Sequence, residues 1–525
     1  MSPSDDTRGV RIVRSKSNSK GWCNLEEVSG ESIADIEGQS LLQIVHLSDI
    51  HICDAQSPAR VEALDRYADP HNLSSALIPL VGTYRAQEIL TTQTFEALIR
   101  KINRFQTGLV SNRPIDAVVI TGDVIDNAQQ NELDWYLEIL HGGVVISDSG
   151  DLSKWEGAAS TDPNRYDRSF WNPEGTPEGC EDDYPRDLYG FPVIKGLLEV
   201  VRAPFISEGL RYPWFSTHGN HDALLQGTVP VNDEIATHAT GFERITRLKP
   251  DVDLRALFET FDEVGPASYP NREMIELETI TPDAARELNK KDDWIQIHND
   301  CGHDHGYRDS DKKYWSRDIG PIRLISLDTV NPHGGWQGSL GRDQFNWLNA
   351  ELSDQEPRFF IILSHHPATT LFNLYDPIGE GRVGEKEVVE LLLSEPRVVA
   401  WLAGHQHKHS IDFRTNSGAL GFWEIETASN IDWPQQGRRI EVIETEEEIA
   451  IVTAVFDHVG DHDPNLDTAF PDIETLAGIS RVLSANDWQR RHGEFSLEKN
   501  AGLHKDRNSV LLRRKALIGL HRKFA

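Results

Sequence analysis

Short apolar runs, each about the length of one β-strand, recur along the chain and are separated by amphipathic segments. Residues 41–47 (LLQIVHL), 116–120 (DAVVI) and 359–363 (FFIIL) are such runs, and they predict buried strands. Residues 86–105 place apolar side chains at helical spacing, which predicts a helix with one apolar face. The order strand, helix, strand predicts an α/β fold in which helices cover a sheet.

Changes in composition divide the chain into three parts. Residues 1–39 are polar and weakly patterned, and we interpret them as an N-terminal extension. Residues 40–460 carry the apolar runs and form the expected catalytic domain, interrupted at about 144–212 and 228–305 by two segments that we interpret as insertions. Residues 461–525 look helical and increasingly basic, which predicts a helical C-terminal extension.

Charge and composition limit the possible partners. The formal net charge is −32, so the field of the whole protein repels polyanions and we expect no nucleic-acid partner. The four cysteines form no CxxC pair, which argues against a zinc ribbon or a disulfide framework. Neither a secretory signal nor a membrane-spanning apolar run is visible, so we expect a soluble, cytoplasmic protein without a membrane partner, or a secreted one if a signal was trimmed. No oligomeric state is predicted.

Five polar clusters each directly follow an apolar, strand-like run. The clusters are Asp49 with His51, Asp123, Asn220 with His221, His365 with His366, and His405 with His407. In α/β folds ligands bind at the carboxyl ends of strands, so we expect these clusters to converge on one pocket. Carboxylate, imidazole and amide groups without cysteine suit divalent ions such as Mn, Fe, Zn, Co or Ni. Asp123 is the natural bridge, because two cations about 3.5–4 Å apart need an anion between them.

The motifs SDIH, TGDVIDN, HGNHD, LSHHP and AGHQH resemble, in the same order, the five motifs of the calcineurin-like metallophosphoesterase superfamily. The resemblance covers about residues 42–410. It implies a four-layer α-β-β-α sandwich of two mixed sheets with flanking helices, with the two insertions forming a cap.

The same resemblance implies two metal ions, with Mn, Fe or Zn as candidates. One ion would be held by Asp49, His51, Asp123 and His407, and the other by Asp123, Asn220, His365 and His405. His365 is the expected ligand rather than His366, because the family histidine lies two residues before the proline; His366 would support the ligands. The implied reaction is attack of a metal-bound hydroxide on phosphorus, without a covalent enzyme intermediate.

Two further residues receive catalytic roles from the resemblance. Asn220 and His221 would bind the substrate, and His221 would also assist departure of the leaving oxygen as a general acid or by stabilising charge. Asp126 is expected either to orient His221 or to serve in a turn or a helix cap.

Departures from the patterns of subfamilies narrow the expected activity. The motif GDVIDN lacks the arginine of serine/threonine protein phosphatases, and Val124, Ile125 and Asp126 stand where purple acid phosphatases carry a tyrosine ligand. The continuation of GNHE typical of 5′-nucleotidases is also missing. What remains resembles the phosphodiesterase and phosphomonoesterase branch, supported by LDTVNPHGGWQGSLGRDQFNWL.

The remaining polar residues are weaker candidates. A loop or pocket-rim role is expected for His303 and His305, and a position beside the ligands for His218. His333, Arg342 and Asn430 are only candidates for the substrate pocket. The chain has neither a GxSxG elbow nor a GxxxxGK loop, which removes serine-hydrolase and P-loop functions.

These observations predict a binuclear-metal phosphoesterase that acts on a small phosphate mono- or diester. The alternatives are a metal-dependent nuclease and a catalytically silent scaffold. A nuclease would need a basic groove, which the net charge of −32 disfavours. A scaffold would have lost ligands, whereas every expected ligand is present. The insertions are expected to set the choice of substrate.

Overall fold

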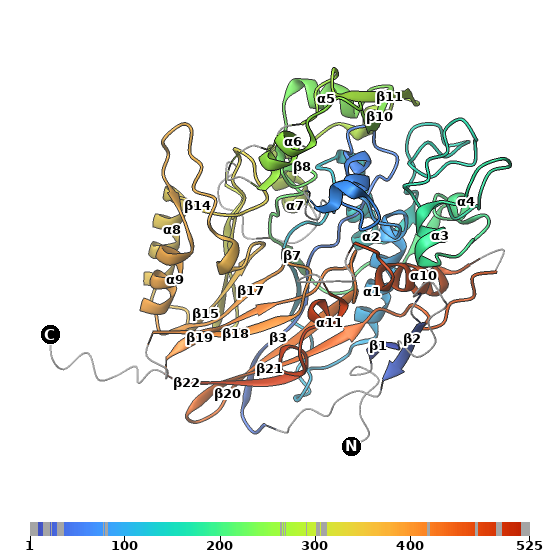
Figure 1. The fold of residues 1–525 in the computed structure, drawn as a ribbon. Helices are drawn as coiled ribbons and strands as arrows, with labels where there is room; N and C mark the ends of the chain where they lie inside the picture. The colour runs from blue at the N-terminus through green and yellow to red at the C-terminus, as the bar shows by residue number, and fades with distance from the viewer. Residues whose placement is uncertain are drawn as a thin grey trace.

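The computed structural model describes most of the chain from residue 36 to residue 515. Within that span it leaves out 77, 79–81, 263–264, 266, 268, 290, 301–304, 306–311, 417–419, 468–470 and 490–495, and before it the description is limited to residues 9–13, 22 and 24–28. Two six-stranded sheets form the centre of the molecule (Figure 1).

The first sheet combines three parallel and three antiparallel strands. Its order is β22 (Ser509–Arg514), β21 (Glu448–Asp457), β20 (Gln436–Glu444), β3 (Gln39–Leu47), β4 (Ala117–Ile120) and β7 (Trp214–Ser216). Strands β3, β4 and β7 run parallel, so their carboxyl ends lie at one edge. The long hairpin β20–β21 continues the sheet in antiparallel pairing.

The second sheet has a parallel centre with an antiparallel strand at each edge. Its order is β12 (Trp315–Ile319), β13 (Ile322–Leu327), β15 (Phe359–Ser364), β17 (Val398–Ala403), β19 (Gly421–Glu426) and β18 (Ser410–Thr415). The four central strands are parallel. Both sheets are therefore mixed, and the predicted α/β class with mixed sheets is confirmed.

The main core is shared by the two sheets. It joins Ile44 and Val118 of the first sheet to Leu324, Leu363 and Leu402 of the second, all with side chains that are fully buried. Every residue of β4, β15 and β17 is buried, which explains why these strands read as continuous apolar runs.

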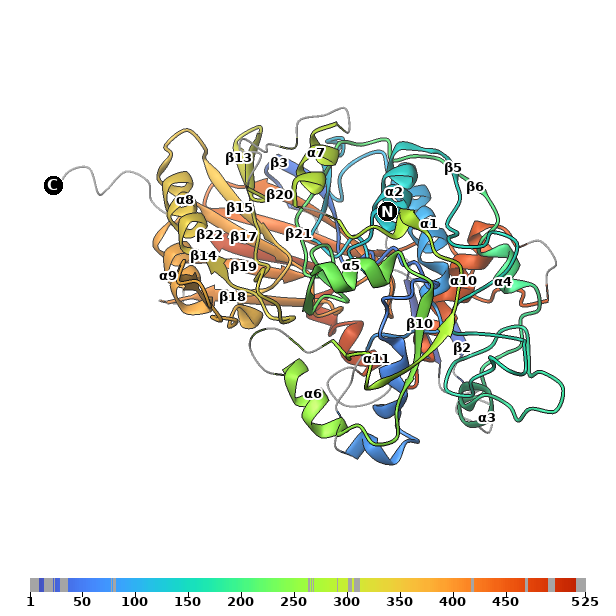
Figure 2. The same cartoon turned by 90° about the horizontal axis from the view of Figure 1, so that it is seen from above.

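Helices lie on two sides of the molecule (Figures 1 and 2). Helices α8 (Arg342–Ser353) and α9 (Glu385–Ser394) pack on the second sheet through Leu348 and Leu392. Helices α1 (Thr91–Arg104) and α2 (Gln130–His141) lie on the other side of the molecule, and both contribute to the main core. Helix α1 occupies most of the predicted 86–105 segment and begins after the short 3-10 turn η5 (Glu88–Leu90).

The two insertions differ in structure. The first is mostly loop, with strands β5 (Gly143–Val145) and β6 (Phe205–Ser207) at its ends and helices α3 (Tyr184–Tyr189) and α4 (Leu197–Val200) between them. The second contains α5 (Asp233–Ala239), the hairpin of β10 (Glu243–Leu248) and β11 (Ile275–Thr279), α6 (Leu254–Asp262) and α7 (Lys291–Asp300). Helices α5 and α6 and the hairpin gather at the top of the view in Figure 1.

The C-terminal segment is not helical throughout, contrary to expectation. It begins with α10 (Ile473–Ala485), which packs on α1, and α11 (Leu497–Asn500). Residues 509–514 then form β22, the edge strand of the first sheet. Leu511 and Arg513 are buried while Leu512 and Arg514 are exposed, a period of two that suits a strand.

The described parts of residues 1–39 include a short antiparallel pair, β1 (Gly9–Val13) with β2 (Asn24–Val28). Among the helices that the structure describes, none is both long enough and apolar enough to cross a bilayer.

Candidate metal centre

The five polar clusters come together at the carboxyl ends of β3, β4, β7, β15 and β17. Candidate ligand atoms lie within 4.8 Å of one another in four groups: Asp49, His51 and His407; His51, Asp123 and His221; Asp49, Asp123 and His365; and His365, His366 and His405. Segments that are far apart in the sequence therefore form one compact set of carboxylates and imidazoles, as the strand-end argument predicts.

Three glycines of the motifs allow this close approach. A Cβ atom on Gly404 would lie 1.7 Å from the Ser48 hydroxyl oxygen, and one on Gly219 would lie 2.2 Å from Asp123 Oδ1. Gly122 has φ +86°, and a Cβ there would meet the ring of His365 at 2.8 Å. These glycines are as necessary to the site as the ligands, yet the sequence analysis assigned them no role. Their place beside each ligand in TGD, HGN and AGH was the available signal.

His365 is the centre of one half of the site. Its Nδ1 donates to the carbonyl oxygen of Thr121 at 2.8 Å, so in the neutral ring Nε2 carries the lone pair. That Nε2 lies 3.1 Å from Asp123 Oδ2 and 3.1 Å from His405 Nδ1. Burial alone would lower the pKa of His365, but the nearby carboxylates of Asp123 and Asp49 raise it to about 9. The surroundings of the His365 ring therefore favour a positive charge.

His407 and His51 form the other half in a similar way. The Nδ1 of His407 donates to Asp432 at 2.6 Å, and its Nε2 lies 3.3 Å from Asp49 Oδ1. The Nδ1 of His51 donates to Asp126 at 2.9 Å, and its Nε2 lies 3.7 Å from Asp123 Oδ2. A carboxylate behind each ring fixes the tautomer that leaves Nε2 free for a metal ion.

Two buried atoms test whether the site fits metal ions. Within the part of the chain that the structure describes, His51 Nε2 and Asn220 Oδ1 have no hydrogen-bond partner. The amide nitrogen of Asn220 donates to the carbonyl oxygen of Gly227 at 3.0 Å, which leaves Oδ1 as an acceptor. A buried polar atom without a partner is costly, and a divalent cation would satisfy both atoms. The residues therefore fit metal binding.

Asp126 contacts both His51 and His221, but its carboxylate is closer to His51. His221 Nδ1 donates to the backbone carbonyl of Asp126 at 2.7 Å and lies 3.5 Å from the carboxylate. Burial would raise the pKa of Asp126, but Arg60 and His51 hold it well below its usual range. Asp126 is not a helix cap, because α2 begins at Gln130 and its N-cap is Gln129.

His221 is the part of the centre that solvent can reach. Its side chain is 18% exposed, whereas those of His51, Asp123 and His365 are almost fully buried. Its backbone nitrogen donates to Asp123 Oδ1 at 2.8 Å, which holds the HGNHD loop against the carboxylate. This position suits a side chain that meets an incoming substrate.

The neighbouring histidines make contacts that occupy their rings. The Nε2 of His366 donates to the carbonyl oxygen of Trp336 at 3.0 Å, and its Nδ1 pairs with the hydroxyl of Thr329 at 2.8 Å. His218 Nε2 accepts from Lys313 at 2.8 Å. Both residues therefore lie beside the ligands as supports.

Of the loop or pocket-rim roles expected for His305, the loop position is confirmed, but the side chain does not lie at an exposed rim. His305 is fully buried and packs edge-on against Trp214 of β7, with ring centroids 4.6 Å apart. The apolar ring of Trp214 holds this end of the insertion against the first sheet. His303 lies outside the described residues.

The three expected pocket residues have different surroundings. Arg342 pairs with Glu387 at 2.9 Å, which ties α8 to α9. His333 lies edge-on to Tyr375, with ring centroids 6.3 Å apart. Asn430 is 1% exposed, and its backbone nitrogen donates to the carbonyl oxygen of Asp49 at 3.0 Å. Of the three, Asn430 is in direct contact with a candidate ligand.

Asp222, the last residue of HGNHD, organises the loops that carry the ligands. Its carboxylate accepts from the backbone nitrogens of Gly219, Asp123, Val124 and Ile125 at 2.7–3.2 Å. This carboxylate therefore ties the loop after β7 to the loop after β4. Sequence reasoning missed Asp222, although its place in the motif was visible, and it missed Asp432, for which no motif gave a signal.

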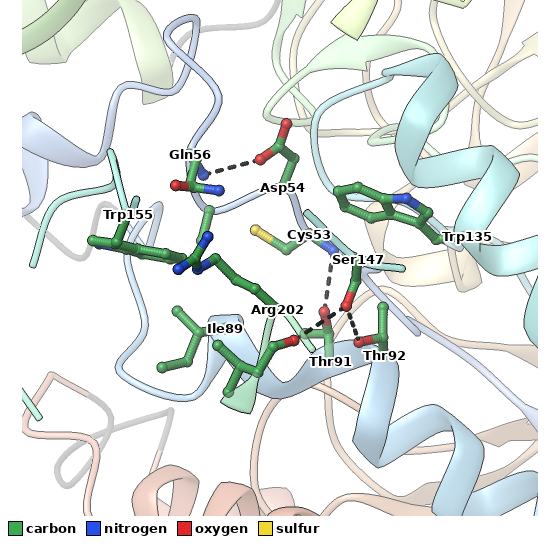
Figure 3. A pocket seen from close by; sticks show the side chains of 12 residues that line it. Cys53, Asp54, Gln56, Ile89, Thr91, Thr92, Trp135, Ser147, Trp155 and Arg202 are labelled. Atoms are coloured by element: carbon green, nitrogen blue, oxygen red, sulfur yellow. Dashed lines mark hydrogen bonds between the residues drawn. The ribbon is translucent and has the colours of Figure 1, made fainter. Parts of the chain in front are cut away.

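A small cavity lies beside the segment that follows His51 (Figure 3). Cys53, Asp54, Gln56, Trp135 and Arg202 contribute to its lining, and its volume is about 20 Å³. That volume holds about one water molecule and no organic substrate. The cavity therefore does not serve as the substrate site.

Comparisons with known proteins agree with the geometry. The sequence profile described as calcineurin-like phosphoesterase matches residues 193–409. No curated protein gives a significant match. Among solved structures, the chain is similar to a dimetal phosphatase from Danio rerio with a TM-score of 0.35 and 11% identity, covering 80% of this chain and 100% of that one.

Two other solved structures are similar over most of this chain. One is a purple acid phosphatase from yellow lupin (Lupinus luteus) seeds, with a TM-score of 0.31, 11% identity, and coverage of 83% of this chain and 55% of that one. The other is a candidate 5′-nucleotidase from Staphylococcus aureus, with a TM-score of 0.28, 12% identity, and coverage of 84% and 58%. Likenesses with such low TM-scores carry no argument about the substrate. The profile match, together with the ligand side chains gathered at the strand ends, identifies residues 193–409 as a calcineurin-like phosphoesterase domain, the domain of metal-dependent hydrolases of phosphate esters.

Proposed function

We propose that the chain is a binuclear-metal phosphoesterase that hydrolyses a phosphate mono- or diester of a small molecule by direct attack of water. The observation that carries the proposal is the position of Asp123 between the two sets of imidazoles. Its Oδ2 lies 3.1 Å from His365 Nε2 on one side and 3.7 Å from His51 Nε2 on the other. A single carboxylate that faces both sets is what two neighbouring cations need between them.

This arrangement supports two ligand sets. Asp49, His51, Asp123 and His407 would hold one ion, and Asp123, Asn220, His365 and His405 the other. Mn, Fe and Zn are the candidates, because the donors are nitrogen and oxygen without thiolate. When bound, two such ions supply charge that stabilises the phosphoryl group and lower the pKa of a coordinated water to about 7.

The protein's own residues would position the ester. His221 faces solvent beside the ligands, and its Nδ1 is held by the backbone carbonyl of Asp126 at 2.7 Å, so Nε2 is directed to serve the phosphate or the leaving oxygen. Asp126 also orients His51 and is thereby a positioning residue. The net charge of −32 supports a small ester rather than a nucleic acid as substrate.

The architecture proposed around this site is a four-layer α-β-β-α sandwich formed by residues 40–460, flanked by the two terminal extensions. The two mixed sheets with a shared core, and α8 and α9 on the outer face of the second sheet, support it. The second insertion would contribute to a cap over the site, because it begins directly after Gly227, whose carbonyl oxygen accepts from the Asn220 amide at 3.0 Å. A Cβ atom on Gly227 would lie 2.4 Å from the Asn220 amide nitrogen and 2.3 Å from the ring of His221.

Metal content and hydrolysis of bis-p-nitrophenyl phosphate and p-nitrophenyl phosphate test the proposal. We expect about two ions per chain and activity on at least one ester, and both should be lost in Asp123→Asn. Asp251→Asn is the matched control, since Asp251 is exposed in a turn of the second insertion. Wild-type protein that stays inactive after reconstitution with Mn, Zn and Fe would refute the proposal. Equal metal content in wild type and Asp123→Asn would refute the bridging role.

A further inference from the structure

Two hydrogen-bonded loops of the second sheet place aromatic side chains beside the metal centre. The indole of Trp336 is stacked on the imidazole of His405, with centroids 5.8 Å apart and planes inclined by 20°. Phe372 meets the same indole edge-on, with centroids 5.9 Å apart. The aromatic pair therefore begins at a candidate metal ligand and extends away from it.

The loops that carry this pair are held rigidly. Asn373 is fully buried, and its amide nitrogen donates to the carbonyl oxygen of Gly334 at 2.8 Å. The amide nitrogen of Asn331 donates to Asn373 Oδ1 at 2.9 Å, and Gly338 exchanges backbone hydrogen bonds with the second loop. Trp336 is fixed further by its carbonyl oxygen, which accepts from the ring of His366 at 3.0 Å. Pre-ordered side chains lose little entropy when a ligand binds.

The second loop also exposes an unusual amount of apolar surface. The exposed fractions are 47% for Phe372, 54% for Leu374, 36% for Tyr375 and 65% for Ile378. Residues 367–381 contain no lysine or arginine. A rigid apolar surface next to a reactive centre is typical of a binding site, whereas polyanions would require basic residues.

We propose that Trp336 and Phe372 form a subsite for an apolar alcohol group, aryl or long-chain alkyl, that is esterified to the phosphate of the substrate. This inference rests on the proposed function, because the phosphate itself would be held at the metal centre. Trp336 forms the inner wall next to His405, and Phe372 forms the outer, more exposed part. The pair thereby favours esters of apolar alcohols over those of small polar ones.

Hydrolysis of a series of esters tests the subsite. Methyl, octyl and 2-naphthyl phosphates, or the corresponding methyl diesters if the wild type prefers diesters, are compared by release of the alcohol or of phosphate. For Phe372→Ala we expect KM for the naphthyl and octyl esters to rise about tenfold, with KM for the methyl ester and kcat for all three unchanged. Phe372→Leu distinguishes the two alcohols, because it should restore the octyl ester and not the naphthyl ester.

The controls separate the subsite from a general loss of structure. Leu503→Ala removes a comparably exposed apolar side chain in the C-terminal extension, and it should change none of the constants. Among the described residues, the ring contact found for Phe372 is with Trp336 and not with a candidate ligand, so the metal content of Phe372→Ala should equal that of the wild type. An unchanged ratio of kcat/KM between naphthyl and methyl esters in Phe372→Ala would overturn the proposal.

Binding of a non-hydrolysable naphthyl phosphonate, measured by calorimetry, gives a readout that does not depend on turnover. We expect Phe372→Ala to bind it about tenfold more weakly than the wild type. If the wild type binds the phosphonate about tenfold more tightly than Phe372→Ala but hydrolyses no ester, the proposed function is refuted and the subsite is retained. Equal binding by wild type and variant would refute the subsite.

Discussion

Arg60 is a buried cation behind the metal centre, and it forms ion pairs with three carboxyl groups. Its guanidinium is 1% exposed and pairs with Glu62 at 2.7 Å, with Glu88 at 2.7 Å and with the carboxylate of Asp126. One buried cation therefore contacts three buried carboxyl groups, one of which, Glu88, has its pKa raised to about 8 by burial. The third of them holds His51, so Arg60 links the stability of the domain to the geometry of the site.

Replacing Arg60 with methionine keeps an unbranched side chain and removes the charge together with its hydrogen-bond donors. Breaking a buried ion pair by removing one partner typically costs about 3–5 kcal/mol, because the other charge is left uncompensated. Glu88 and Asp126 pair with Arg60, whereas Glu62 is shared with Arg244 at 3.4 Å, and proton uptake by one of these carboxyl groups relieves part of the penalty. We therefore expect Arg60→Met to lose about 3–5 kcal/mol of unfolding free energy. Metal affinity should fall about 10- to 100-fold, because Asp126 no longer holds His51 firmly.

Urea unfolding followed by tryptophan fluorescence, together with metal analysis after dialysis, measures both effects. Arg255→Met is the matched control. Arg255 is 75% exposed, and the ion pair found for it within the described part of the chain is with Glu259. Such a surface pair contributes about 0.5 kcal/mol or less. Arg60→Lys should fall between wild type and Arg60→Met, since it retains the charge and loses the planar fork. If the unfolding free energy of Arg60→Met lies within about 1 kcal/mol of the wild-type value and the variant keeps its metals, the prediction is wrong.

Three further substitutions test separate parts of the structure. Asp432→Asn weakens the acceptor of the His407 Nδ1–H at 2.6 Å, so metal affinity should fall about 10- to 100-fold in chelator titrations, and unchanged affinity would contradict the orienting role. Burial raises the pKa of Glu426 from 4.5 to about 8. The contribution of the protonated carboxyl group to folding stability is therefore complete below pH 4.5 and lost as pH rises through 8. Glu426→Gln should match the wild-type Tm at pH 5 and exceed it at pH 9. Gly404→Ala places a Cβ 1.7 Å from a side-chain oxygen and should abolish metal binding with unchanged circular dichroism, whereas Gly341→Ala, whose nearest neighbour is at 3.7 Å, should bind normally.

The sequence predicts the framework of the site because two strong signals coincide in it. Strands β15 and β17 are buried at all six positions each, so they stand out as apolar runs, and the ligands follow them directly. Parallel neighbours end at the same edge of a sheet, so convergence of the clusters follows without knowledge of strand order. Residue type and order then indicate the chemistry.

The residues that hold the ligands in place could not be predicted, because they act through contacts between distant segments that leave no periodic pattern in the sequence. Asp432 reaches His407 from a loop 25 positions away, and Arg60 reaches Asp126 across 66 positions. Whether Asp126 serves His51 or His221 depends on loop geometry, since both rings are within 3.5 Å of its side chain. The strand β22 was missed for another reason: its alternation covers only six residues within a basic stretch of the sequence.

The backbone itself fixes where the ligands point. Asp49, His51, Asp123, His405 and His407 all have φ between 49° and 70°, the left-handed region that Asp and His tolerate better than most residues. Such positions cost about 1–3 kcal/mol each and persist only where the surroundings impose them. Here the imposing contacts are backbone hydrogen bonds, such as His51 N to the carbonyl of Asp123 at 2.9 Å. Alanine at a ligand position would therefore disturb the loop as well as the donor set, whereas asparagine tolerates the same φ. If Asp123→Asn loses both metals, the cause would thus be the missing negative charge of the bridging side chain and not a rearranged loop.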